Sequence, residues 1–148
     1  MESVTTFRRV KFHFDNVHFK VPLEFGAYRL VQAGDLATEA DYFCAPHIQS
    51  VYEISYVVSG EGVFSVDGNP YPLRKDMLFI NRPGEEHSIL SNKSNPIRYF
   101  YLGFSFHEQS LSKYEYKTLK DFFDTSEKRI ATAGSSLQDS FLKLFNNL

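Results

Sequence analysis

The feature that most constrains the fold is an alternation of apolar residues with period two, which continues to about residue 106 and is interrupted by glycine-bearing turns. In residues 51–58, Tyr56 lies on one face, while Glu53 and Val57 share the other. Successive side chains of a strand point to opposite faces, so we expect both faces of this strand to be partly covered. The carboxylate of Glu53 therefore shares its face with apolar side chains.

Turn signals divide this region into short strands. Gly60 and Gly62 break the first strand, and Asp67-Gly68 predicts a two-residue hairpin, because a primed turn needs the positive φ that these residues tolerate. Further strands are predicted at residues 27–32, 63–66, 77–80, 88–90 and 98–106. Many short strands separated by glycine and proline turns predict an all-β sandwich or barrel.

Beyond residue 106 the apolar period lengthens to nearly four, which predicts helices. One helix is expected over residues 114–123, with Leu119, Phe122 and Phe123 facing inward. The last helix is expected to begin with a capping box formed by Ser135 and Gln138. Its single apolar stripe consists of Leu137, Phe141, Leu144, Phe145 and Leu148.

The expected organisation is a barrel with an N-terminal arm over residues 1–106 and helices over residues 107–148. The last helix reaches Leu148 without a closing signal, so we expect the natural chain to continue. Residues 1–16 are expected to be a solvated terminus, with an arm that folds across the barrel mouth as the alternative.

Composition excludes several classes of protein. The net charge of −2 gives no positive field for nucleic acid, and no apolar stretch approaches the ~20 residues that a membrane helix needs. The single Cys44 cannot form an internal disulfide, and charged residues near the N-terminus argue against a secretion signal. These observations favour a cytoplasmic protein. No nucleophile triad, phosphate loop or CxxC pair is present, so no enzyme is expected.

The stretch from His47 to His87 resembles the two sequence motifs of the cupin superfamily. The first motif is matched by His47, Gln49, Glu53 and Gly60, and the second by Lys75-Asp76, residues 77–80, Pro83-Gly84 and His87. Two positions depart from the pattern: Gln49 lies where metal-binding cupins have a histidine, and Lys75 replaces a glycine.

The segment YEISYVVSGEG, the aromatic strand at 99–106 and the helices after it resemble the N-terminal sensor half of AraC-type transcription regulators. The resemblance implies a cupin (double-stranded β-helix, jelly-roll) barrel followed by C-terminal α-helices that pair two subunits. It also implies that DNA is bound only through a helix-turn-helix domain, which these residues lack.

The polar residues of the two motifs permit two chemical interpretations. If a metal is present, His47, Glu53 and His87 would be its ligands, with Gln49 as a weak fourth. A neutral amide is a poor replacement for imidazole, so we expect no cofactor. Burial of Glu53 would then be balanced by a bound polyol, a histidine or tyrosine hydroxyls.

The second interpretation is a small-molecule site. If Tyr99 and Tyr101 face the interior with Glu53, the cavity combines flat apolar walls with a few hydrogen-bonding groups. The expected ligand-binding residues are His47, Gln49, Glu53, His87, Tyr99, Tyr101 and Arg29. The alternative for the tyrosines is that they fill the core, and for Arg29 that it forms a surface salt bridge.

Three functions remain. The favoured one is an effector-sensing and dimerisation domain of an AraC-type regulator, which binds a small polar organic molecule such as a sugar. Its homodimer would form through the stripe on the last helix, because an exposed apolar stripe is typical of an interface. The alternatives are a small metal-dependent cupin enzyme, an isomerase or dioxygenase, and a cupin-fold binding or storage protein.

Overall fold

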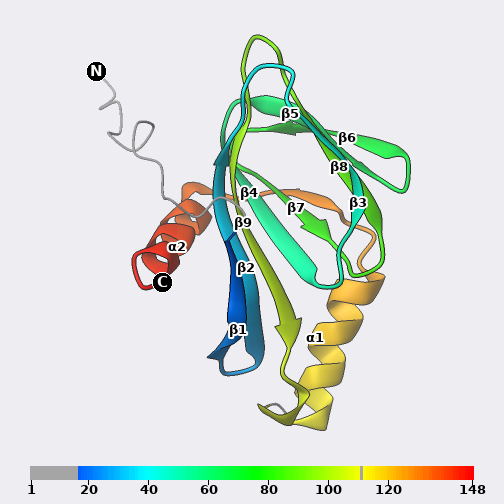
Figure 1. Ribbon diagram of the computed structural model, residues 1–148. Coiled ribbons are helices and arrows are strands. Elements are labelled where there is room, and N and C mark those ends of the chain that lie inside the picture. Colours follow the sequence, from blue (N-terminus) through cyan, green and yellow to red (C-terminus); the bar gives the residue numbers. More distant parts are fainter. Residues whose placement is uncertain (1–16, 111) are drawn as a thin grey trace.

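The computed structural model describes residues 17–110 and 112–148, and in this part of the chain two antiparallel sheets face each other (Figure 1). The larger sheet has the strand order β1 (Val17–Phe25), β2 (Tyr28–Ala37), β9 (Arg98–Phe106), β4 (Tyr52–Ser59), β7 (Met77–Asn81) and β10 (Ile130–Thr132). The smaller sheet has the order β3 (Phe43–Ile48), β8 (Glu86–Ser91), β5 (Glu61–Val66) and β6 (Asn69–Arg74). This is the mainly β barrel that the alternation predicts.

The sequence signals locate the turns and most strands correctly. Asp67 and Gly68 both have positive φ, 47° and 80°, and they join Val66 directly to its partner Asn69. Strand β9 has the predicted bounds. Gly62 lies inside β5 and does not break a strand, while Gly60, with φ of 78°, provides the interruption. Strands β1, β3, β6 and β10 were not predicted, although β1 alternates apolar and polar residues along its length.

Two apolar clusters hold the fold together, one on each face of the larger sheet. The cluster between the sheets contains Val57, Phe64, Phe79 and Ile97, which are fully buried. The cluster on the outer face joins Tyr56, Val58 and Phe100 to two phenylalanines of the last helix. The larger sheet is therefore covered on both faces.

Helix α2 (Ser135–Phe145) covers the outer face of the larger sheet (Figure 1). Phe141 and Phe145 are each 3% exposed, so the prediction of an exposed stripe is wrong: these side chains pack on the sheet of their own chain. Leu142 joins this cluster with Leu137 and Leu148 at its margin, whereas Leu144 is half-buried outside it.

The prediction of a capping box at the last helix is wrong. Ser135 is the first residue of α2, and its N-cap is Gly134, which forms no side-chain cap bond. Gln138 instead accepts a 3.5 Å contact from the Tyr56 hydroxyl, which draws it toward the sheet. The capping box belongs to α1 (Lys113–Thr125), where Ser112 and Glu115 bond each other's backbone. A short 3₁₀ turn, Glu108–Ser110, precedes it.

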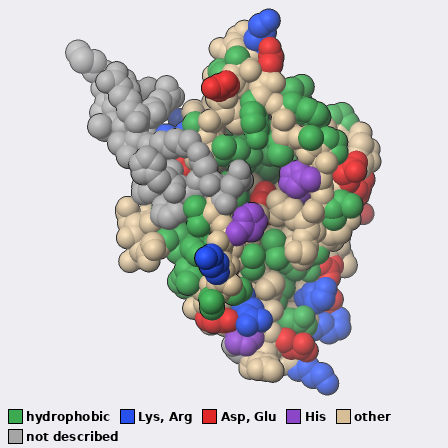
Figure 2. Space-filling view, in the orientation of Figure 1, with side chains coloured by type: hydrophobic (Ala, Val, Ile, Leu, Met, Phe, Trp, Pro, Cys, Tyr) green, Lys and Arg blue, Asp and Glu red, His purple; other side chains and the backbone are tan. Residues whose placement is uncertain are grey.

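Helix α1 packs at the end of the barrel through Phe123 and Tyr116, whose ring lies 6.3 Å from that of Phe106. The Phe123 ring lies 5.5 Å from the rings of both Tyr52 and Phe104, whereas Phe122 is 59% exposed, so the prediction that Phe122 faces inward is wrong. Charged side chains gather over α1 in Figure 2. Among the described helices, none has the length and apolar character needed to span a bilayer. The predicted arm, residues 1–16, lies outside the described residues.

Candidate functional site

A cavity of about 460 Å³ lies between the two sheets, at the seam where β3 faces β1 and β2. Its lining comes from six strands and from the turn before β4. The lining residues are His18, Val31, Gln32, Leu36, Tyr42, Cys44, His47, Ile48, Gln49, Ser50, Val51, Glu53, His87, Ile89, Tyr99 and Tyr101. Figure 2 shows histidine side chains near the middle of the face of the molecule that it draws. The volume falls in the range that suits a small organic molecule.

The parity of β9 decides which aromatic residues reach the cavity. Tyr99 and Tyr101 line it, while Phe100 points to the opposite face, where its ring lies 5.1 Å from that of Phe145. The prediction that the tyrosines and Glu53 share the interior face is confirmed. Burial raises the pKa of Tyr99 well above its ordinary value, so its hydroxyl stays protonated.

Glu53 is the centre of the polar network at the cavity floor. It is 5% exposed, and its Oε2 accepts hydrogen bonds from Gln32 Nε2 at 2.8 Å and Gln49 Nε2 at 2.9 Å. Its Oε1 has longer contacts, 3.3 Å to Asn81 Nδ2 and 3.4 Å to Ser55 Oγ. Burial raises the pKa of Glu53, and these donors offset the shift only in part. The acid is thus held by neutral donors.

Two glycines make room for the cavity wall. A Cβ on Gly103 would lie 2.3 Å from the side chain of Gln32, its cross-strand partner, and a Cβ on Gly34 would lie 2.0 Å from the ring of Tyr101. The absence of a side chain lets Gln32 reach Glu53. Sequence reasoning missed Gln32, although a glycine inside an aromatic strand is a signal for close approach at that position.

His47 and His87 are cross-strand partners whose ring centroids lie 4.3 Å apart. His47 Nδ1 donates to the carbonyl of Ala45 at 2.9 Å. Burial and the neighbouring His47 lower the pKa of His87 to about 4, so its imidazole is neutral near pH 7. A hydrogen bond to the backbone of Glu85 raises this pKa, which means that the ring donates it.

His87 Nδ1 is buried and has no hydrogen-bond partner among the described residues. The side chain is 2% exposed and lies on the cavity wall. An unpaired buried polar atom is costly, and Nδ1 has almost no exposed surface, so a ligand would reach it only if the side chain moved.

The arrangement does not fit a metal ion. Within residues 17–110 and 112–148, no three His, Cys, Asp or Glu side chains are grouped as ligands. Glu53 already accepts from protein donors on both oxygens. The conditional ligand set of His47, Glu53 and His87 therefore borders one cavity without converging on one point.

Six of the seven expected ligand-binding residues line the cavity, and Arg29 does not. Arg29 Nε donates to Glu24 at 2.8 Å, where both side chains are nearly half exposed. Arg29 therefore forms the surface salt bridge that was the alternative to a role in ligand binding. Burial and the nearby Glu53 raise the pKa of Cys44, so its thiol stays protonated on the cavity wall.

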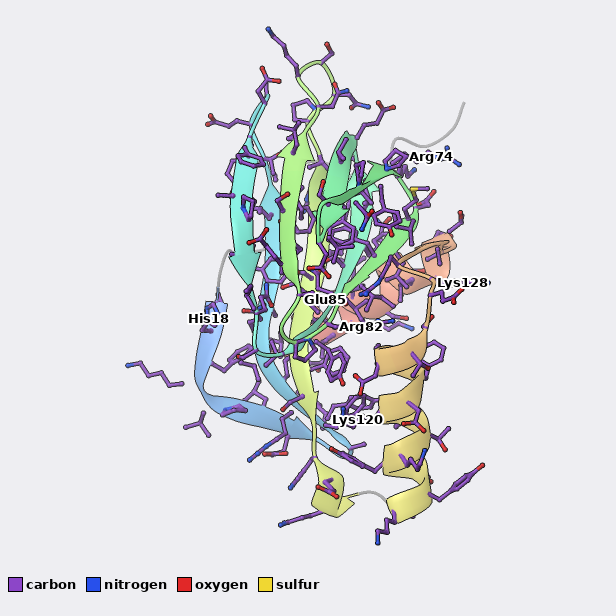
Figure 3. The ribbon with its side chains drawn as sticks, turned by 90° about the vertical axis from the view of Figure 1, so that its right-hand side faces the viewer. His18, Arg74, Arg82, Glu85, Lys120 and Lys128 are labelled. Carbon is purple, nitrogen blue, oxygen red and sulfur yellow. The ribbon has the colours of Figure 1, made fainter. Side chains whose placement is uncertain are left out.

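The turn between β7 and β8 joins the cavity rim to α1. Gly84 N donates to Gln49 O at 2.9 Å, while Arg82 Nε donates to Phe123 O at 2.6 Å and the same guanidinium reaches Ser126 O. Figure 3 shows Arg82 and Glu85 beside the end of α1, with His18 across the molecule on β1. Sequence reasoning missed this link.

Glu85 completes the clamp through a bidentate ion pair with Arg129, which precedes β10. Burial alone would raise the pKa of Glu85, but its hydrogen bonds to Arg129 and Arg82 outweigh burial and lower it. The carboxylate is therefore charged at neutral pH, and the turn is held to both α1 and β10.

The chain is similar in sequence to a known protein family and to a curated relative. Residues 30–148 match the family described as AraC-like ligand binding domain. Over 75 residues the chain is 35% identical to a protein of Bacillus subtilis (strain 168) named uncharacterized HTH-type transcriptional regulator YfiF. The matched part is 51% of this chain and 23% of that protein, so the chain spans less than a quarter of its relative's length.

Two solved structures share the fold. The protein YhaK from Escherichia coli has a TM-score of 0.55 and 13% identity, over 79% of this chain and 48% of that one. The cupin domain of Schizosaccharomyces pombe Cnp3 has a TM-score of 0.50 and 19% identity, over 73% of this chain and 66% of that one. At these identities the likeness establishes a cupin-like barrel.

Proposed function

The chain belongs to the family of AraC-like ligand-binding domains, and from this premise we propose that it is the effector-sensing part of a transcription regulator. The cavity between the two sheets would bind a small polar organic molecule, a sugar or a compound of similar size. The observation that carries the proposal is the polar floor at Glu53, enclosed by the aromatic walls of Tyr99 and Tyr101.

Binding would be passed on through the β7–β8 turn. Gln49 bonds Glu53 through its side chain and Gly84 through its carbonyl, and the same turn clamps α1 through Arg82. An effector that binds two arrangements of these elements with different affinities would shift their populations. In a longer regulator, that shift would change how the DNA-binding part is presented.

We also propose that two copies pair through the C-terminal helices. Support comes from one apolar side chain that each helix leaves outside the core: Leu144 of α2 is half-buried outside the core cluster, and Phe122 of α1 is 59% exposed. Sedimentation at about 100 μM is expected to give a dimer, and Leu144→Glu to give a monomer. A strictly monomeric wild-type protein would exclude this pairing.

Thermal denaturation in the presence of a library of sugars, polyols and amines tests the effector proposal. A compound that binds the native state at 100 times its Kd stabilises the protein by about 2.7 kcal/mol. The expected result is a rise in Tm that is reduced in Gln49→Ala and retained in Arg29→Ala, whose side chain lies outside the cavity. A rise that persists in Gln49→Ala would place binding elsewhere.

A further inference from the structure

Glu53 is the one Asp or Glu side chain among the described lining residues, and protein donors bond both of its oxygens, as they would a carboxylate. No lysine or arginine of residues 17–110 and 112–148 lines it, and the His87 imidazole is neutral near pH 7. An anion entering this space would meet the Glu53 carboxylate and no lysine or arginine among the described lining residues, whose other basic groups are the imidazoles of His18, His47 and His87. Burying an unpaired charge in this way is costly.

The hydrogen-bond donors at the floor are largely used by the protein itself. Gln32 Nε2 donates both to Gln49 Oε1, at 3.0 Å, and to Glu53 Oε2, at 2.8 Å, so both of its hydrogens are engaged. Gln49 Nε2 donates to the same Oε2. The amide groups that would otherwise hold an anion are turned toward Glu53.

The hydroxyl groups of Tyr42, Ser50 and Tyr99 also line the cavity and can donate, but hydrogen-bond acceptors remain at the floor as well. Glu53 Oε1 has only contacts of 3.3 and 3.4 Å, which are long for hydrogen bonds to a carboxylate. His87 Nδ1 is buried without a partner on the same cavity wall. The rings of Tyr99 and Tyr101 supply faces that pack against a flat or cationic group.

We infer that the cavity selects effectors that are rich in hydrogen-bond donors and carry no negative charge, such as polyols and amines, over carboxylates and phosphates. This inference rests on the proposed effector-binding function. Two like charges about 8 Å apart, at an effective dielectric constant of about 20, repel enough to weaken binding about 30-fold. Selection by charge would therefore be readily measured.

The test uses the 148-residue chain and a metabolite extract divided by anion exchange at pH 7. The unretained fraction holds neutral and cationic molecules, and the retained fraction holds anions. The unretained fraction is expected to raise Tm by at least about 3 °C, while the retained fraction changes it by less than about 1 °C. Stabilisation by the retained fraction alone overturns the inference and leaves effector binding in place. No stabilisation by either fraction overturns the proposed function as well.

A variant connects the effect to the carboxylate. Glu53→Gln keeps the size of the side chain, so its own Tm serves as the baseline, and it is expected to lose more than half of the shift caused by the unretained fraction. Arg29→Ala, outside the cavity, is the matched control and is expected to keep the full shift. An undiminished shift in Glu53→Gln would overturn the role given to this acid.

Discussion

The two faces of the larger sheet hold their buried acids in different ways. On the face toward α2, Asp35 is fully buried and receives two hydrogen bonds from Arg98, Nε at 2.8 Å and Nη2 at 2.6 Å. On the face toward the cavity, Glu53 receives only neutral amide and hydroxyl donors. A bidentate guanidinium fixes both charge and geometry, whereas neutral donors leave a carboxylate responsive to whatever enters the cavity.

The largest effect on stability is expected from breaking the ion pair of Arg98 with Asp35. Arg98→Ala removes the bidentate guanidinium from the buried Asp35, and the expected loss is about 3–5 kcal/mol in the free energy of unfolding, because breaking a buried ion pair is costly. Urea denaturation followed by circular dichroism measures this loss. A loss below about 1 kcal/mol would show that the pair does not fix the charge as described.

The next largest effect on stability is expected on the cavity side, where a glycine of β9 is replaced by alanine. Gly103→Ala places a methyl group in the space of the Gln32 side chain, so we expect a loss of about 1–3 kcal/mol and weaker effector binding. Gly134→Ala is the control: a Cβ there has no neighbour within 4 Å, and the expected loss is under about 1 kcal/mol. Equal losses in both variants would contradict the close approach of Gln32.

The pH dependence of stability tests how Glu53, the acid on the cavity side, is held. The folded-state pKa of Glu53 is raised above 4.5, so its contribution is full below pH ~4.5 and is lost as pH rises through the folded pKa. The free energy of unfolding of Glu53→Gln minus that of the wild type should therefore increase with pH above ~4.5. His87 is present in both proteins, so its opposite dependence cancels in the difference. A difference that is flat between pH 4 and pH 8 would contradict the raised pKa.

The smallest effect is expected where an ion pair is exposed. Arg29 and Glu24 form a contact of 2.8 Å, similar in length to that of Arg98 with Asp35, but they are 47% and 45% exposed. Arg29→Ala should cost less than about 1 kcal/mol, because solvent screens the pair. Denaturation in low and high salt checks this, and a loss as large as that of Arg98→Ala would remove burial as the cause of the difference.

The sequence predicts well the parts of the fold that depend on local pattern. The alternation in residues 51–58 and 98–106 assigns Glu53 to the face of Tyr99 and Tyr101, and Asp67-Gly68 fixes a hairpin. Strands such as β3 and β6 were missed because their pairing, rather than their own apolar pattern, defines them. Tertiary context overrides local preference in such segments.

The candidate site was predicted less completely, since its missing members act over long sequence separations. Gln32 reaches Glu53 only because Gly103, on a third strand, has no side chain. The apolar stripe on α2 was predicted to be an interface, although the alternation of β9 also turns Phe100 away from the tyrosines and toward the C-terminal helices, where the structure buries the stripe. Amphipathic periodicity shows that a helix buries one side, and says nothing about which surface covers it.

Strand β10 has a consequence for the order in which this chain is made. It pairs with β7 through Ile130 and Phe79, so one edge of β7 stays bare until the ribosome has released residues far downstream. Strand pairings between segments far apart in the sequence form late in folding. An unpaired strand edge can pair with another chain and so promote aggregation. Translation that stalls before Ile130 would therefore release an aggregation-prone intermediate, and a chaperone would be needed longest at this edge.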